Sequence, residues 1–64
     1  MEIKSLNYEE LLWAFDVLKD NKHSIISIQW FVINVYFSFR DGLIDIEEKN
    51  RLLDMAETLI NTNN

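Results

Sequence analysis

The central part of the chain is too apolar to form a helix with a single buried face. From Ile25 to Asp41, eleven of the 17 residues are apolar, whereas a helix that buries one face carries roughly seven apolar residues over this length. On a helical wheel most of the eleven fall into two stripes. A helix with two apolar faces needs cover on both of them. The segment must therefore lie at the centre of a bundle, meet a second chain, or do both.

The two stripes differ in composition, which suggests different partners. The first contains Ile25, Ile28, Val32, Val35 and Phe39, and the second contains Ile26, Trp30, Ile33 and Phe37. Large aromatic side chains concentrate at the centres of interfaces. We therefore expect the second stripe to contact another chain and the first to pack inside this one. Small polar residues border the second stripe and would let two helices approach closely: Ser27, Asn34 and Ser38.

The same segment is rich in β-branched and aromatic residues, which also favour strands. However, polar residues recur seven, eleven and fourteen positions after Ser27, and this spacing places them on one side of a helix but on both faces of a strand. Ser24 offers an N-cap, and Gly42 offers a stop because glycine adopts positive φ without steric cost. We predict a helix, with a strand over residues 25–33 as the alternative.

Two further helices carry clear start signals. Asn7 is a good N-cap, and Glu10 lies three residues later, where its side chain can bond back to the backbone N–H of the cap. Asp45 and Glu48 repeat this capping box before the last apolar stripe. The three predicted helices cover residues 8–20, 25–41 and 46–61.

These elements predict one all-α domain over residues 1–64. The chain has no Cys and no Pro, so no disulfide framework supports its fold. A chain of this length lies near the lower limit for a self-sufficient core, and small domains add disulfides, a metal or a partner chain. We expect a compact three-helix bundle with the second helix at its centre, and we expect it to form a homodimer.

Trp13 is a further candidate for the interface. It lies on the first predicted helix among the acidic residues Glu9, Asp16 and Asp20. A tryptophan on a charged face is either covered by lysine stems or anchors an interface, and acidic neighbours do not supply such stems. The candidate interface residues are Trp13, Ile26, Trp30, Ile33 and Phe37.

No residue pattern in the chain predicts catalysis or a cofactor. His23 is the single histidine, and no nucleophile–base pair or phosphate-binding loop accompanies it. Residues 41–48 match the second half of a calcium-binding EF-hand loop, but Phe37 and Phe39 occupy the positions that require oxygen ligands. We therefore expect no enzymatic activity, no bound metal and no cofactor.

The net charge of −5 disfavours binding to nucleic acid or to an anionic membrane. The chain shows no bilayer-spanning stretch and no signal-peptide pattern, so we expect a cytoplasmic protein. Its predicted function is that of a non-enzymatic protein–protein interaction module. Such a module would be a small regulator or inhibitor, of the kind that phages and plasmids encode, acting on a protein target.

The alternative function is an acidic nucleic-acid mimic that blocks a DNA-binding protein. Carboxylates in ordered rows would imitate phosphates, and the binding of such a mimic would fall steeply with ionic strength, unlike apolar docking. The candidate rows are Glu9, Asp16 and Asp20 on the first helix, and Glu47, Asp54 and Glu57 on the third.

Overall fold

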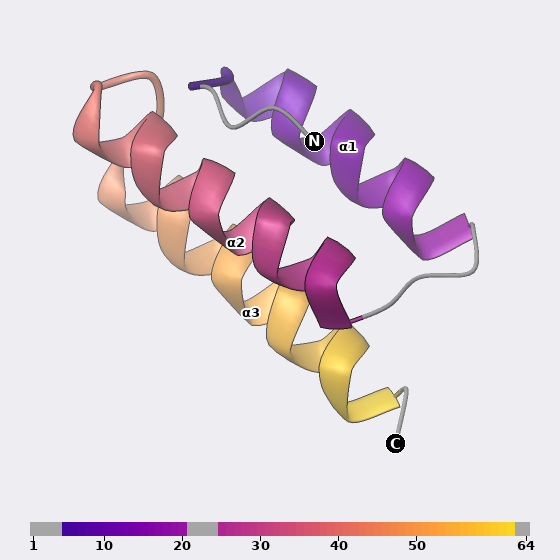
Figure 1. Cartoon of the computed structure of the whole chain (residues 1–64). Helices are drawn as coiled ribbons and strands as arrows, with labels where there is room; N and C mark the ends of the chain where they lie inside the picture. Colours follow the sequence, from indigo (N-terminus) through magenta and orange to yellow (C-terminus); the bar gives the residue numbers. More distant parts are fainter. Residues whose placement is uncertain (1–4, 21–24, 63–64) are drawn as a thin grey trace.

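The computed structural model describes residues 5–20 and 25–62, which form three helices and no strand. The helices are α1 (Tyr8–Asp20), α2 (Ile25–Arg40) and α3 (Ile46–Thr62). They run alternately up and down and all pack against one another (Figure 1). The all-α prediction is confirmed, and the first half of the middle segment is helical rather than a strand. The predicted bounds differ by one residue at the ends of α2 and α3.

Helices α1 and α3 begin with the same pair of reciprocal hydrogen bonds. The Glu10 N–H donates to Asn7 Oδ1 over 2.8 Å, and the Asn7 N–H donates to Glu10 Oε1 over 3.1 Å. At α3 the equivalent bonds join Asp45 and Glu48 over 2.8 and 3.0 Å. These bonds satisfy backbone donors that the start of a helix leaves unpaired. The predicted cap Ser24 and the single histidine, His23, lie outside the described residues.

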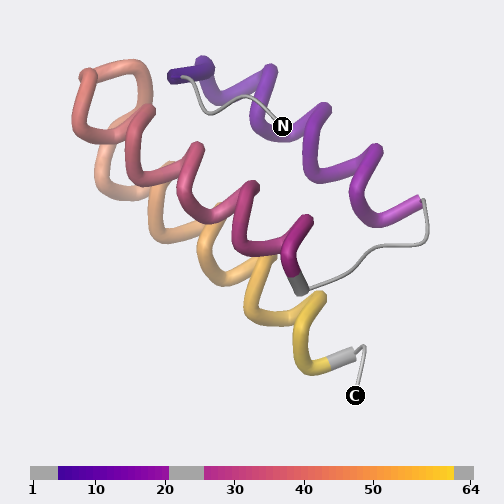
Figure 2. The backbone as a smooth tube through the Cα atoms, in the orientation of Figure 1, coloured from indigo at the N-terminus to yellow at the C-terminus, as the bar shows by residue number. Residues whose placement is uncertain are grey.

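The end of α2 is a tight turn centred on Gly42. Its φ is +81°, in the left-handed region that favours glycine. The Gly42 N–H donates to the Phe39 carbonyl over 3.1 Å, and the Leu43 N–H donates to the Ser38 carbonyl over 3.0 Å. This pair of bonds is the Schellman motif, which satisfies carbonyls at the helix end. The turn joins α2 and α3 as a hairpin (Figure 2).

The core lies between the three helices and receives side chains from each of them. Phe15 on α1 and Phe31 on α2 meet at its centre, with their ring centroids 5.4 Å apart and the rings tilted by 56°. Tilted ring pairs of this kind stabilise beyond the area that they bury. The buried apolar residues are Leu11, Ala14, Phe15, Ile28, Phe31, Val35, Ile44, Leu52 and Ala56.

Candidate functional site

The inward face of α2 is rotated from the position that its stripes predict. Phe31, which belongs to neither stripe, is fully buried at the centre of this face. Of the first stripe, Ile28 and Val35 are fully buried, but Val32 is only partly buried and Phe39 is 37 % exposed. The prediction that the whole stripe packs inside is therefore wrong at Phe39. Phe31 packs against Phe15, and this contact turns the Phe31 side of α2 toward α1. The rotation of α2 follows from it.

The row of small polar residues faces the chain's own core, so its predicted position at the edge of an interface between chains is wrong. Asn34 and Ser38 are almost completely buried. The Ser38 hydroxyl donates to the Asn34 carbonyl over 2.7 Å and accepts the Leu6 N–H over 2.8 Å. The Asn34 side-chain amide donates to the Trp30 carbonyl over 2.7 Å. Because these bonds satisfy polar groups internally, burial of the row does not carry the usual desolvation cost.

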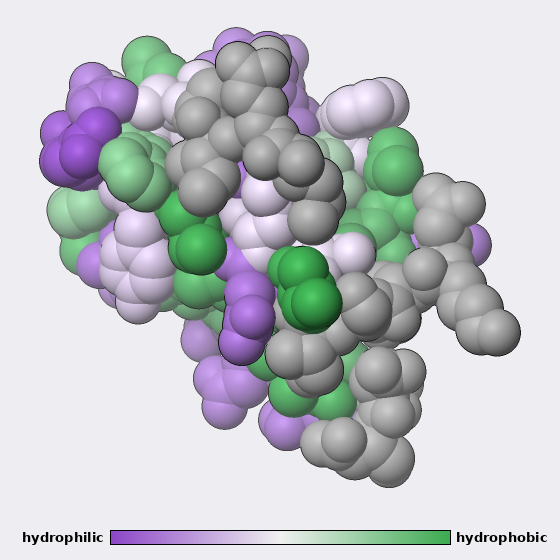
Figure 3. All heavy atoms as spheres, viewed as in Figure 1, coloured by the Kyte–Doolittle hydropathy of each residue, from purple (hydrophilic) through white to green (hydrophobic). Residues whose placement is uncertain are grey.

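The second predicted stripe of α2 faces outward. Its four members lie within about 60° of one another around the helix axis. Ile26 is 67 % exposed and Ile33 is 39 % exposed. Trp30 and Phe37 are partly buried, and the Arg40 guanidinium lies 4.3 Å from the centroid of the Phe37 ring. Figure 3 shows hydrophobic spheres along the outward side of α2, interrupted by hydrophilic ones.

A groove between α1 and α2 brings the two tryptophans together. Trp13 remains 69 % exposed, and Trp30 extends the groove onto the outward stripe of α2. The groove has a volume of about 200 Å³ and is lined by Leu6, Glu10, Trp13, Ala14 and Trp30. We call the surface formed by Trp13, Ile26, Trp30 and Ile33 the α1/α2 face.

Of the five candidate residues, Trp13 and Trp30 line the groove together. Ile26 and Ile33 are exposed on the same stripe of α2 as Trp30, and Phe37 on that stripe is covered by Arg40. The Arg40 cover was not predicted, although a cation three residues from an aromatic ring on a helix is a recognisable signal. Leu6, Glu10 and Ala14 were likewise not predicted as groove residues. Their position depends on how α1 sits against α2, which no local pattern specifies.

The opposite flank of α2 has a different cover. Tyr36 and Phe39 lie beside α3, where the Lys49 ammonium is 5.8 Å from the Tyr36 ring centroid and 4.6 Å from that of Phe39. A cation over an aromatic face is attracted by the ring quadrupole, and the lysine stem covers apolar area as well. The apolar side chains on this flank are therefore partly shielded by the chain itself.

Two charged groups are held by specific hydrogen bonds. The Ser5 hydroxyl donates to the Asp41 carboxylate, and with the nearby Arg40 guanidinium it lowers the pKa of that carboxyl. Across the bundle, Arg51 donates to the Tyr8 hydroxyl over 3.0 Å, and this bond raises the pKa of the guanidinium. The first contact joins Ser5, before α1, to the residue that follows α2, and the second joins α1 to α3. The six carboxylates of the candidate acidic rows are all exposed.

Within residues 5–20 and 25–62, no three His, Cys, Asp or Glu side chains are grouped as metal ligands. Of the helices described, none combines the length and the apolar character needed to cross a bilayer. Comparisons with protein families, with curated proteins and with solved structures found no match to this chain.

Proposed function

We propose that the protein is a non-enzymatic protein–protein interaction module that acts as a homodimer through the α1/α2 face. The observation that carries the proposal is the exposure of Trp13 and Ile26, each more than two-thirds accessible at 69 % and 67 %. Monomeric proteins rarely leave contiguous apolar patches of this kind in water. Tryptophan is also the residue type most enriched among side chains that dominate binding energy.

A second copy of the chain is the occupant that we favour. An interface with two-fold symmetry uses the same patch on both copies, so the patch must contain protrusions as well as hollows. The α1/α2 face offers both, because the exposed Trp13 lines the groove of about 200 Å³ beside Trp30, and Ile26 is exposed one helical turn before Trp30. Dimerisation also adds buried apolar area to a chain that is small for an independent core.

The dimer would serve a small cytoplasmic regulator or inhibitor, of the kind that phages and plasmids encode, whose surface outside the α1/α2 face docks on a protein target. The competing function is the acidic nucleic-acid mimic, which the exposed carboxylates on α1 and α3 would serve. Ionic strength separates the two functions. Binding of a mimic to a DNA-binding protein falls steeply as salt rises, whereas apolar docking changes little.

Analytical ultracentrifugation tests the homodimer. At micromolar concentration the wild-type chain is expected at about twice its mass of 7.7 kDa. The matched variants are Ile26→Glu and Ile46→Glu, which introduce the same charge at exposed isoleucines in the first turns of α2 and α3. A carboxylate suits both helix starts equally, so the variants differ in whether they lie on the α1/α2 face.

We expect Ile26→Glu to shift the protein toward monomer and Ile46→Glu to leave the dimer unchanged. Circular dichroism on the same samples establishes that both variants remain helical. A wild-type chain that stays folded and monomeric at micromolar concentration contradicts the proposal. Dissociation by Ile46→Glu but not by Ile26→Glu would place the interface at the start of α3 instead of on the α1/α2 face.

A further inference from the structure

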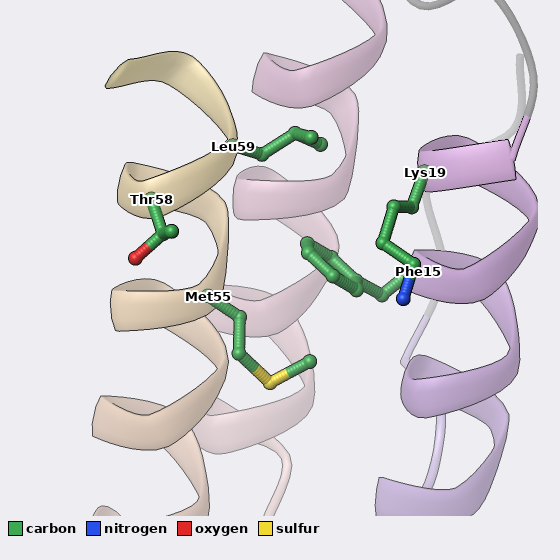
Figure 4. Close-up of a pocket in the computed structure, with 5 residues that line it drawn as sticks. All are labelled: Phe15, Lys19, Met55, Thr58 and Leu59. Atoms are coloured by element: carbon green, nitrogen blue, oxygen red, sulfur yellow. The ribbon is translucent and has the colours of Figure 1, made fainter. Parts of the chain in front are cut away.

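A second hollow lies between α1 and α3, on a different pair of helices from the groove of the α1/α2 face (Figure 4). It has a volume of about 330 Å³ and is lined by Phe15, Lys19, Met55, Thr58 and Leu59. This volume lies at the lower end of the range found for small-molecule sites. The hollow is therefore large enough for a small ligand, and its position leaves the proposed dimer interface untouched.

The walls of the hollow are almost entirely apolar. Phe15 is buried and extends from α1 into the space, while Met55 and Leu59 approach from α3 and are only partly buried (Figure 4). Methionine is unbranched and polarizable, so Met55 can adjust to the shape of a bound apolar group. An aliphatic chain placed here would cover apolar surface that water contacts in the free protein.

Two polar side chains border this apolar space. The Thr58 hydroxyl donates to the Asp54 carbonyl over 3.0 Å, so its proton is already engaged. Lys19 runs back along α1 toward Phe15, as lysines on helices do, and its amine lies beside the hollow (Figure 4). Within residues 5–20 and 25–62, Arg40 and Asp41 form the one ion pair. The Lys19 ammonium therefore has no carboxylate partner among these residues.

We propose that this hollow binds a short aliphatic monocarboxylate. The alkyl chain lies against Phe15, Met55 and Leu59, and the carboxylate accepts hydrogen bonds from the Lys19 ammonium. At about 30 Å³ for each water-sized unit, the volume accommodates roughly ten non-hydrogen atoms. The single cation matches a single negative charge, and the net charge of −5 disfavours ligands with more negative charge.

Nuclear magnetic resonance titration with sodium octanoate, below the concentration at which it forms micelles, tests this site. Octanoate has ten non-hydrogen atoms, and 1-octanol is a neutral probe with the same chain length. We expect saturable shifts of the Met55 methyl resonance and of the amides around Phe15 and Leu59. For a ligand of this size, the Kd of octanoate should be of the order of 0.1–1 mM.

Two lysine variants isolate the role of the ammonium. Lys19→Gln should weaken octanoate binding by up to about five-fold, the upper end of the range for one exposed ion pair, and should leave octanol binding unchanged. Lys49→Gln removes the same charge on the far flank of α2 and should leave both probes unaffected. Because neither lysine is buried, both variants are expected to fold, and their amide spectra verify this directly.

Several results would overturn the proposal. One is the absence of saturable shifts, and another is equal affinity for octanol and octanoate. A third is an equal loss of octanoate binding in the two lysine variants, which would indicate a general charge effect. Shifts centred on Trp13 and Trp30 would place the probe in the other groove. Octanoate binding in this hollow does not require the homodimer, because the two use different surfaces. Sedimentation tests the homodimer separately.

Discussion

The two flanks of α2 both expose apolar side chains, but they differ in what covers them. On the flank beside α3, Lys49 lies over the Tyr36 and Phe39 rings. On the α1/α2 face, Ile26 and Ile33 are aliphatic and offer no ring face to a cation. Exposure alone therefore does not identify an interface. The aromatic flank beside α3 obtains part of its cover within the chain, whereas our proposal assigns the cover of Ile26 and Ile33 to a second copy.

The largest expected effect comes from a charge at the middle of the α1/α2 face. Ile33→Glu would bury a carboxylate in the centre of the proposed dimer contact, without a cation or water to compensate for it. We expect association to weaken by at least about 100-fold, equivalent to roughly 2.7 kcal/mol, so that sedimentation at micromolar concentration reports a monomer.

The matched control is Tyr36→Glu on the other flank. Tyr36 is 51 % exposed, compared with 39 % for Ile33, and its ring lies near the Lys49 ammonium, which would pair with the new carboxylate. This variant should remain dimeric. Equal masses for the two variants would remove the distinction between the flanks. A dimeric Ile33→Glu together with a helical but monomeric Val32→Glu would show that their roles are reversed.

The next effect concerns the turn that places α3 beside the aromatic flank. A Cβ at Gly42 would meet no atom within 4 Å, so the cost of Gly42→Val comes from its backbone at φ +81°. A β-branched residue resists this region, and we expect a loss of about 1–2 kcal/mol in the free energy of unfolding. Asparagine tolerates the region better, so Gly42→Asn should lose less in urea denaturation. Equal stability of all three proteins would contradict this interpretation.

A smaller effect is expected where the aromatic flank loses its cation. Lys49→Met retains most of the apolar stem but removes the charge over Tyr36 and Phe39, which should lower stability by about 0.5–1 kcal/mol. Lys49→Arg keeps a cation there and should remain close to the wild type in thermal denaturation. If Lys49→Met is as stable as the wild type, the stem alone provides the cover.

The smallest effect is expected at Asp41, which lies next to Arg40, the residue that covers Phe37. The pKa of Asp41 lies below its ordinary value of 3.8, first because of the Ser5 hydroxyl and then because of Arg40. The stabilising contribution of this carboxylate is present above the pKa of the unfolded chain and is lost as the pH falls through the lower folded value. Ser5→Ala should therefore move the Asp41 carboxyl titration to higher pH in carbon-detected magnetic resonance. An unchanged midpoint would assign the shift to Arg40 alone.

The starts of α1 and α3 and the end of α2 were predictable because their signals are local. Each capping box joins residues three positions apart, and the Gly42 turn needs only a residue that accepts positive φ. The outward orientation of Ile26 and Ile33 was also expected from the spacing of apolar residues. These features require no knowledge of how the helices pack.

The rotation of α2 was not predictable in the same way. Hydropathy classes Asn34 and Ser38 as polar, so the helical wheel assigns them to an edge. Their burial depends on side-chain bonds to carbonyls four residues earlier and on the Leu6 amide, which needs an acceptor. Phe31 lies between the two stripes, and its place at the centre of the core depends on Phe15 from another helix.

The Leu6–Ser38 hydrogen bond has a consequence for the order of folding. It joins residues 32 positions apart, and closing a long loop costs more chain entropy than closing a short one. Contacts of low sequence separation form early, so the hairpin of α2 and α3 can assemble around its own tight turn. The cap of α1 is local, so we expect α1 to form its first turn independently and to dock last, when the Leu6 N–H meets the Ser38 hydroxyl of α2.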